Sequence, residues 1–255
     1  MKACCIFLLL ALVLSVSAQG PEPAQLAHGN VPGEPHHHLK IENDYVRAYF
    51  VEVPGHRSTQ LHQHDNDYLF VSLGAADAIN AVQDKPEVHL TLKDGETHFV
   101  RGGFAHVARN LAGAPFRNVT IALLKPQDDA ENLCAQVVAG APVGVCNVSP
   151  GEDYAREPQF DTSEMRLDLL RLSAKGTYAE KGAKLAFLIV SAGDFGIKMS
   201  AKGRPAVKLR QGDMMWFDAG SDVQFKNDSI KQTELLKLTF KDSVPQAKPD
   251  TPSPD

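Results

Sequence analysis

The sequence predicts an all-β protein built from two lobes. Short apolar segments of strand length recur between residues 45 and 240, and Gly, Pro, Asp and Asn separate them at short intervals. This spacing is typical of β-sandwiches and β-barrels. The chain has 255 residues, enough for two domains of roughly 100 residues each. An internal repeat supports the division into two.

The predicted strands follow one another with polar turns between them. Residues 45–53 are rich in aromatic and β-branched side chains, which favour strands. Further apolar runs of strand length occur at 68–73, 119–124, 186–190 and 235–240. Residues 126–160 lack this rhythm, and we expect them to connect the lobes.

The repeat places similar residues at one fixed offset. Residues 92–96 (LKDGE) resemble residues 209–213 (LRQGD), which lie 117 positions further along the chain. Several matches at one offset, each in a strand-like context, indicate two copies of one fold. Other pairs at this offset are Gly103 and Gly220, Asn110 and Asn227, and Phe99 and Trp216.

The N-terminus predicts export. Lys2 precedes an apolar run at 6–13, and small residues follow up to Ala18. This is the layout of a secretory signal with cleavage after Ala18, and the run is too short to span a bilayer comfortably. We therefore expect residues 1–18 to be a signal peptide and the protein to be periplasmic or secreted, without a membrane partner. An N-terminal anchoring helix is the alternative.

The remaining boundaries follow from composition. Residues 19–34 are rich in Pro, Gly, Ala and Gln and predict a flexible leader. We expect the first lobe at 35–125, the connection at 126–160 and the second lobe at 161–241. The prolines and scarce apolar residues of 242–255 predict a disordered tail.

Two cysteines remain after the predicted cleavage, Cys134 and Cys146. In an oxidising compartment such a pair is expected to form a disulfide, which would contribute about 3 kcal/mol in the chain-entropy model. Two free buried thiols are the alternative. The formal net charge of −5 shows no basic excess of the kind that nucleic-acid binding requires.

Histidine is unevenly distributed, because all ten histidines lie in the first 106 residues. His62 and His64 are two apart, so in a strand their side chains point to the same face. His106 follows a Gly-rich turn. Converging imidazoles are good ligands for zinc, iron, copper, nickel or manganese, although His-x-His alone also fits a polar strand edge.

The segments around these histidines resemble the two sequence motifs of the cupin superfamily. Residues 55–74 match the first motif, with a glycine, His-x-His and an apolar strand that ends in glycine. Residues 95–110 match the second, although Arg101 replaces the usual proline. The resemblance implies a bicupin of two double-stranded β-helix barrels, with His62, His64 and His106 on metal-ligand positions.

One departure from the motif concerns the metal set. The family's glutamate beyond His-x-His is replaced by Tyr68 and Leu69. A phenol with a pKa near 10 is a poor ligand at neutral pH, so Tyr68 is a candidate lumen residue instead. Three histidines plus water are the simplest site, which weakens the case for manganese. The alternative is an empty polar lumen.

The second lobe keeps the scaffold without the histidines. Val223 stands where His106 stands in the first lobe, and valine cannot bind a metal. We expect a structural lobe, with an apolar ligand near Met214, Met215 and Trp216 as the alternative.

The other histidines and two arginines receive weaker assignments. The tract at 36–38 predicts a structural or surface role, with auxiliary metal binding as the alternative. Among the remaining histidines, His98 is the better lumen candidate and His89 fits a strand surface. Arg101 and Arg109 are expected at a solvated strand end, with anion binding as the alternative.

Three functions fit these observations. The first is a metal-dependent enzyme on a small molecule, such as a dioxygenase or an isomerase. The second is a non-catalytic module that binds a metal or small ligand, and the third is a structural protein. By resemblance to cupins, a homodimer through strand edges is also expected.

Overall fold

A computed structural model describes residues 29–193 and 196–242. The predicted signal peptide at 1–18 lies outside the described residues, as does all but the first residue of the predicted tail at 242–255. Within the described part the chain forms β-strands and a short 3₁₀ helix, η1 (Val31–Gly33). No helix in these two stretches is both long and apolar enough to cross a membrane.

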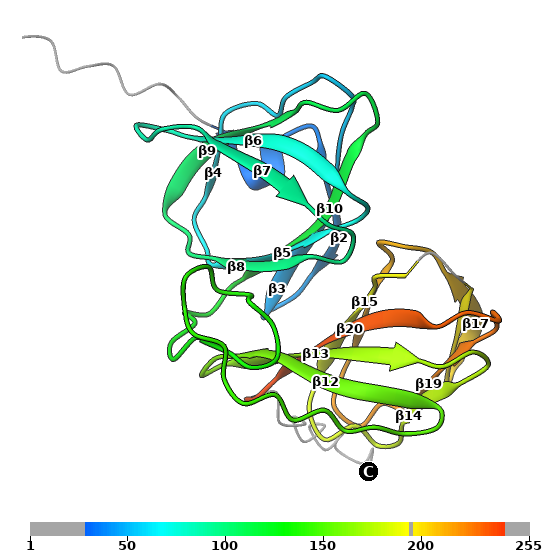
Figure 1. Cartoon of the computed structure of the whole chain (residues 1–255). Helices are drawn as coiled ribbons and strands as arrows, with labels where there is room; N and C mark the ends of the chain where they lie inside the picture. Colours follow the sequence, from blue (N-terminus) through cyan, green and yellow to red (C-terminus); the bar gives the residue numbers. More distant parts are fainter. Residues whose placement is uncertain (1–28, 194–195, 243–255) are drawn as a thin grey trace, which may run out of the picture.

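The first lobe is a barrel of two five-stranded sheets, drawn in blue to green in Figure 1. One sheet has the order β1-β4-β9-β6-β7 and the other β2-β3-β10-β5-β8. Its strands are β1 (Gly29–Asn30), β2 (His37–Glu42), β3 (Val46–Val53), β4 (His62–His64), β5 (Tyr68–Ser72), β6 (Ala76–Val82), β7 (Val88–Leu92), β8 (Thr97–Val100), β9 (Phe104–Asn110) and β10 (Phe116–Leu123).

The second lobe repeats this arrangement. A six-stranded sheet has the order β11-β12-β13-β20-β15-β18, and a four-stranded sheet has the order β14-β19-β16-β17. The strands are β11 (Glu131–Asn132), β12 (Tyr154–Asp161), β13 (Met165–Leu172), β14 (Thr177–Glu180), β15 (Phe187–Ser191), β16 (Ile197–Ala201), β17 (Arg204–Leu209), β18 (Met214–Phe217), β19 (Val223–Asn227) and β20 (Thr233–Phe240).

The repeat read from the sequence corresponds to a repeat of structure. The side-chain amide of Asn110 donates to the carbonyls of Val53, Pro54 and Ala114. Asn227, 117 residues later, makes the same three contacts in the second lobe, with the carbonyls of Leu172, Ser173 and Lys231. Each asparagine closes the end of its barrel by satisfying buried backbone carbonyls.

The lobes share one hydrophobic core. The outer face of the β2-β3-β10-β5-β8 sheet packs against the six-stranded sheet of the second lobe. The residues at this contact include Leu69 and Ile121 from the first lobe and Leu167, Leu188 and Leu238 from the second, each no more than 1% exposed. Burial of apolar surface therefore holds the lobes together in addition to the covalent connection.

The side chains that were weighed as an apolar ligand site in the second lobe are partly buried and pack against the hydrophobic cores. Met214 and Trp216 pack against the shared core, and Met215 packs against the core inside the second barrel. The Trp216 ring stacks on Tyr45 of the first lobe, with ring centroids 5.4 Å apart.

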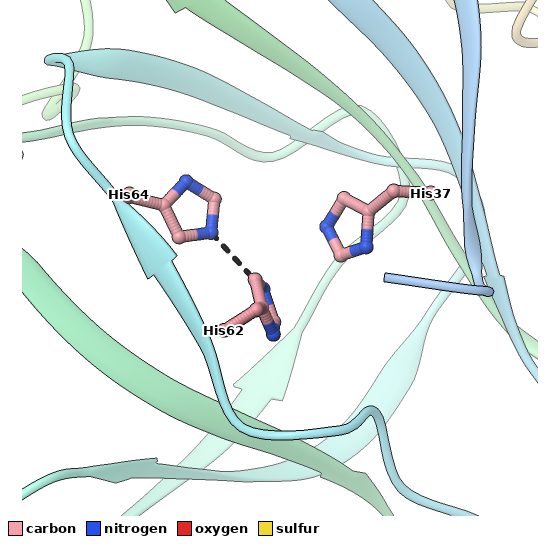
Figure 2. Close-up of side chains that lie close together, drawn as sticks. All are labelled: His37, His62 and His64. Atoms are coloured by element: carbon pink, nitrogen blue, oxygen red, sulfur yellow. Dashed lines mark hydrogen bonds between the residues drawn. The ribbon is translucent and has the colours of Figure 1, made fainter. Parts of the chain in front are cut away.

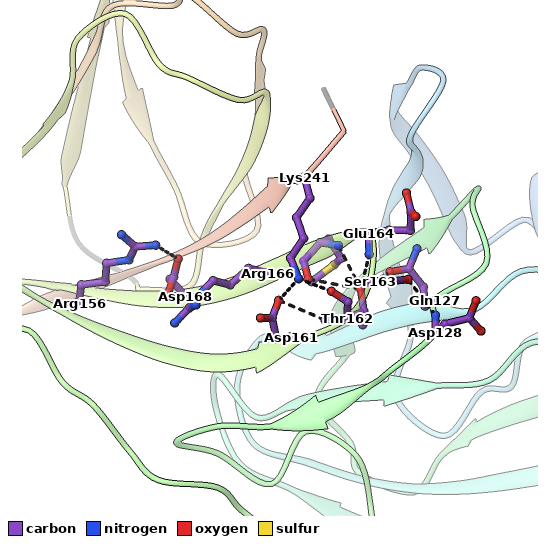
Figure 3. A network of polar contacts seen from close by, with 11 residues as sticks. Gln127, Asp128, Arg156, Asp161, Thr162, Ser163, Glu164, Arg166, Asp168 and Lys241 are labelled. Atoms are coloured by element: carbon purple, nitrogen blue, oxygen red, sulfur yellow. Dashed lines mark hydrogen bonds and ion pairs between the residues drawn. The ribbon is translucent and has the colours of Figure 1, made fainter. Parts of the chain in front are cut away.

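Polar contacts fix the start of the connection to the second lobe (Figure 3). The Thr162 hydroxyl donates to the side-chain oxygen of Gln127 at 2.7 Å. The backbone N–H of Ser163 donates to the carbonyl of Asp128 at 2.8 Å. The connection is therefore packed along the second lobe from its first residues.

Two predicted boundaries differ from the structure. Strand β12 occupies residues 154–161, mostly inside the predicted connection at 126–160, and pairs with β13. Its sequence is polar and carries Pro158 at a register shift, so it shows no apolar alternation. At the other end, β1 and η1 lie within the predicted leader at 19–34. Cys134 and Cys146 form the predicted disulfide.

Candidate metal centre

Strands β4 and β9 bring the three predicted histidines together. His62 and His64 lie at the two ends of β4 and are 1% and 3% exposed, so both side chains point into the barrel. His106 on β9 stands directly opposite His62 in the antiparallel register. Cross-strand neighbours share a face of the sheet, so His106 joins the other two in the lumen.

The three Nε2 atoms form a nearly equilateral triangle. The distances are 3.2 Å from His62 to His64, 3.1 Å from His62 to His106 and 3.2 Å from His64 to His106. An ion held about 2.0–2.1 Å from each imidazole nitrogen fits over a triangle of this size.

The opposite ring nitrogens determine which tautomer is present. Nδ1 of His62 lies 2.8 Å from the carbonyl oxygen of Gln60, and Nδ1 of His106 lies 2.6 Å from the amide oxygen of Asn80. Both oxygens only accept hydrogen bonds, so both Nδ1 atoms carry the proton and each Nε2 presents a lone pair. Metal-binding histidines are oriented in the same way by a second set of contacts.

Burial keeps these imidazoles uncharged. Burial is the largest cause, and together with the charges of the neighbouring histidines it lowers the pKa of His64 to about 2 and that of His106 to about 3. Burial also lowers the pKa of His62. At neutral pH the Nε2 lone pairs of His62 and His106 therefore face each other without a proton between them, and a cation at this point removes their repulsion. The residues present fit a metal ion.

A fourth histidine reaches the cluster from β2. One ring nitrogen each of His37, His62 and His64 lies within 4.8 Å of the others. Figure 2 shows the three imidazole rings close together. His37 stands opposite Val51, which lines the same small cavity. The sequence favoured a structural or surface role for residues 36–38, so this position of His37 was missed. The tract itself was the available signal.

Glu34 orients His37 from behind. Nδ1 of His37 lies 2.7 Å from Oε2 of Glu34, which leaves Nε2 of His37 free to face the lumen. Burial by itself raises the pKa of Glu34, but hydrogen bonds from His37 and from the backbone N–H groups of Gln60 and His36 lower it to about 2. Glu34 is therefore a buried carboxylate beside the candidate centre.

Tyr68 lines the lumen beside the histidines. Its ring stacks on His64 with centroids 4.3 Å apart. Burial raises its pKa above the ordinary value, so the phenol stays protonated. Tyr68 can therefore donate a hydrogen bond inside the barrel.

Two cavities adjoin the histidines. A small one of about 50 Å³ is lined by all four histidines, and a larger one of about 590 Å³ begins at His106 and Tyr68. The smaller volume suits a few water-sized groups beside an ion, and the larger lies in the range of small-molecule sites. Phe70, Ala108 and Phe116 line both, so the two cavities lie on either side of these side chains.

The other polar residues singled out from the sequence lie outside the cluster. His98 lines the larger cavity and pairs with Glu96 at 2.9 Å. His89 pairs with Asp77 and is exposed.

Both arginines are already partnered by carboxylates. Arg101 lies 2.7 Å from Asp67, and Arg109 pairs with Glu87. This pairing agrees with the solvated strand end expected for the two arginines.

Comparison with known proteins identifies the architecture. No protein-family model and no curated protein sequence matches the chain. Among solved structures, AerE from Microcystis aeruginosa aligns with a TM-score of 0.57 and 11% identity, over 82% of this chain and 99% of AerE. Salicylate 1,2-dioxygenase from Pseudoaminobacter salicylatoxidans, with gentisate adducts, aligns with a TM-score of 0.55 and 11% identity, over 77% and 68%.

At 11% identity these similarities establish the fold alone. The chain has the two-barrel bicupin fold that the sequence predicted, and the histidine cluster in its first barrel supports a metal-binding cupin.

Proposed function

We propose that the first lobe binds a divalent metal ion through His62, His64 and His106 and uses it to act on a small molecule. One observation carries this proposal. Three imidazole Nε2 atoms lie 3.1–3.2 Å from one another, and hydrogen-bond acceptors lie behind two of the rings. The sequence of the second lobe contains no histidine. A bound ion of this kind would supply Lewis-acid or oxygen-activating chemistry.

The residues around the centre have separable roles in this proposal. Gln60 and Asn80 hold two of the imidazoles in the metal-binding tautomer. Tyr68 donates a hydrogen bond to a polar group of the ligand, because burial keeps the phenol protonated. Phe70 and Phe116 give both cavities apolar walls beside the centre.

Neutral nitrogen donors favour zinc, copper, iron or nickel over manganese. Of the two reaction types considered, we favour oxidation of a small molecule by a dioxygenase-type reaction over isomerisation. The support is the fold shared with salicylate 1,2-dioxygenase, together with a larger cavity that is lined by His106 and Tyr68 of the candidate centre.

A second function has its own observation. His37 brings a fourth imidazole to the cluster and occupies space that a reacting ligand would need. A metal with four histidine ligands would fit a binding module that does not turn its ligand over. The two functions therefore differ in whether His37 stays on the metal when a ligand enters.

Metal analysis of the purified chain tests the metal site. We expect one bound ion per chain, lost in His62→Ala and in His106→Ala and retained in His89→Ala, a matched control on the exposed surface of the same lobe. Absence of metal from the parent chain after reconstitution with each candidate ion would reject the site.

Oxygen uptake separates the enzyme from the binding module. The metal-loaded protein is assayed with a panel of small molecules, beside His37→Ala. Uptake by the parent supports the enzyme. Metal retention without uptake, in the parent and in His37→Ala, supports the binding module.

We also infer that the protein acts outside the reducing cytosol. The Cys134–Cys146 disulfide supports export, because such bonds persist in oxidising compartments. The mass of the secreted protein tests this inference, and cleavage after Ala18 is the expected result.

A further inference from the structure

The larger cavity of the first lobe has one wall that does not belong to the barrel. Strands β5 to β9 supply most of its lining, but Val138 and Ala139 come from the connection between the lobes. The segment read from the sequence as a connection therefore forms part of the candidate ligand site.

Covalent and hydrogen bonds hold this wall in place. The disulfide Cys134–Cys146 closes a loop that carries both wall residues. The side chain of Asn132 donates to the carbonyls of Val138 and Ala141 and accepts from the N–H groups of Val137 and Val138.

The loop is also attached to the barrel. The N–H of Phe99 on β8 donates to the carbonyl of Val137 at 2.8 Å, and the Val137 side chain is 1% exposed in the core between the lobes. Val138 follows directly, so its position in the cavity wall is fixed by the anchored Val137 and by the side chain of Asn132.

The lining indicates the class of ligand. Most of it is apolar, including Phe70, Leu90 and Phe116. The charged and titratable side chains in the lining are already partnered, with His98 on Glu96, Arg101 on Asp67 and His89 on Asp77. A charged ligand would have to compete for these partners while losing water, which is unfavourable in an apolar cavity.

We propose that Val138 and Ala139 form the selective wall of the first barrel's cavity, and that this cavity takes an uncharged ligand with an apolar body. The proposal rests on the proposed function for the polar end of the ligand, which would face His106 and Tyr68. The wall itself does not depend on a metal being bound.

A matched pair of fluorescent probes tests the ligand class. N-phenyl-1-naphthylamine is uncharged, and 8-anilinonaphthalene-1-sulfonate carries the same two ring systems with an added sulfonate. The full chain should bind the uncharged probe at least about tenfold more tightly. Equal or tighter binding of the sulfonate would overturn the assignment of an uncharged ligand.

Substitutions in the loop test the wall. Val138→Trp fills the cavity from the loop side and should weaken binding of the uncharged probe about tenfold or more. Leu90→Trp fills it from β7 and should act alike, which locates the probe in this cavity. Val145→Trp is the control, because Val145 lies within the same disulfide loop but is 80% exposed.

Cys134→Ser with Cys146→Ser tests whether the loop must be held. Loss of the cross-link should weaken probe binding severalfold without changing the metal content of the chain.

Thermal unfolding of each variant shows whether it is folded, and Val138→Phe repeats the test of the wall with a smaller side chain than Trp. If Val138→Trp, Val138→Phe and Val145→Trp all bind the probe like the parent, the wall assignment is wrong. The metal content of the same samples tests the proposed metal site independently of the wall assignment.

Discussion

The two barrels share a backbone design but differ in what fills them. The first contains cavities of about 50 and 590 Å³ beside its histidines. In the second, Phe217 and Phe225 are 1% and 0% exposed inside the barrel. Their counterparts at the offset of 117 residues are Val100 and Ala108, which line the larger cavity of the first lobe. In the second lobe, two larger side chains therefore occupy the space that is open in the first lobe.

The polar centres differ as well. Val223 faces Glu180 across the strands of the second lobe, where His106 faces His62 in the first. Glu180 pairs with the buried ammonium of Lys237, which also lies 2.8 Å from the Tyr178 hydroxyl. The second barrel thus holds a buried lysine–glutamate pair where the first gathers neutral imidazoles.

This comparison separates what the scaffold needs from what the site needs. The turn glycines and the barrel-closing asparagines occur in both lobes, because the backbone requires them in each copy. The lumen residues are free to differ, since either an internal ion pair or a metal can stabilise polar groups in a barrel. The following changes are ordered by the size of the effect expected.

Exchanging the lumen residues should have unequal costs in the two lobes. Phe225→Ala removes a fully buried ring from a filled barrel and should lower the free energy of unfolding by about 4 kcal/mol. Ala108→Phe enters an existing cavity and should cost about 1 kcal/mol or less. Urea unfolding measures both, and equal costs would mean that the lobes are packed alike.

Removing the internal cation should destabilise the second lobe. Lys237→Met leaves Glu180 without its ammonium partner and should cost about 3 kcal/mol, because one member of a buried pair is lost. Adding Glu180→Gln should recover part of this loss. The metal content of the chain should be unchanged in both variants. Loss of metal would contradict the assignment of Lys237 to the stability of the second lobe alone.

Acid should act on the first lobe through its buried histidines. Their pKa values are lowered in the folded chain, to about 2 for His64 and about 3 for His106. The unfolded chain therefore takes up protons first as the pH falls below about 6.5, and stability decreases.

For the metal-free protein, this effect should reach about 2 kcal/mol per buried histidine between pH 6.5 and pH 5. Urea unfolding with a chelator present at each pH measures it. Constant stability across this range would contradict burial of neutral imidazoles.

Much of the fold and part of the site could be predicted from the sequence. Strand parity placed His62 and His64 on one face, and the repeat at Asn110 and Asn227 marked equivalent barrel ends. These features are local or periodic, so a single sequence displays them.

Other features depend on tertiary pairing. His37 faces the lumen through its register with β3, and a register shift between Leu39 and Ile41 interrupts the parity of that strand. Lys237 belongs to no motif, although one charge within the apolar strand 235–240 was a signal of a buried partner. The loop wall at Val138 was missed because residues 126–160 show no periodicity.

The smallest predicted effect concerns the contact behind His106. Asn80 accepts a hydrogen bond from Nδ1 of His106 at 2.6 Å, and the same register position in the second lobe holds Met199, opposite Phe225. Asn80→Met therefore places in the first lobe the residue type that the second lobe has at this position. Metal affinity should fall about tenfold, because the imidazole loses the group that fixes its tautomer. Competition with a chromophoric chelator measures this, and unchanged affinity would show that β9 alone positions His106.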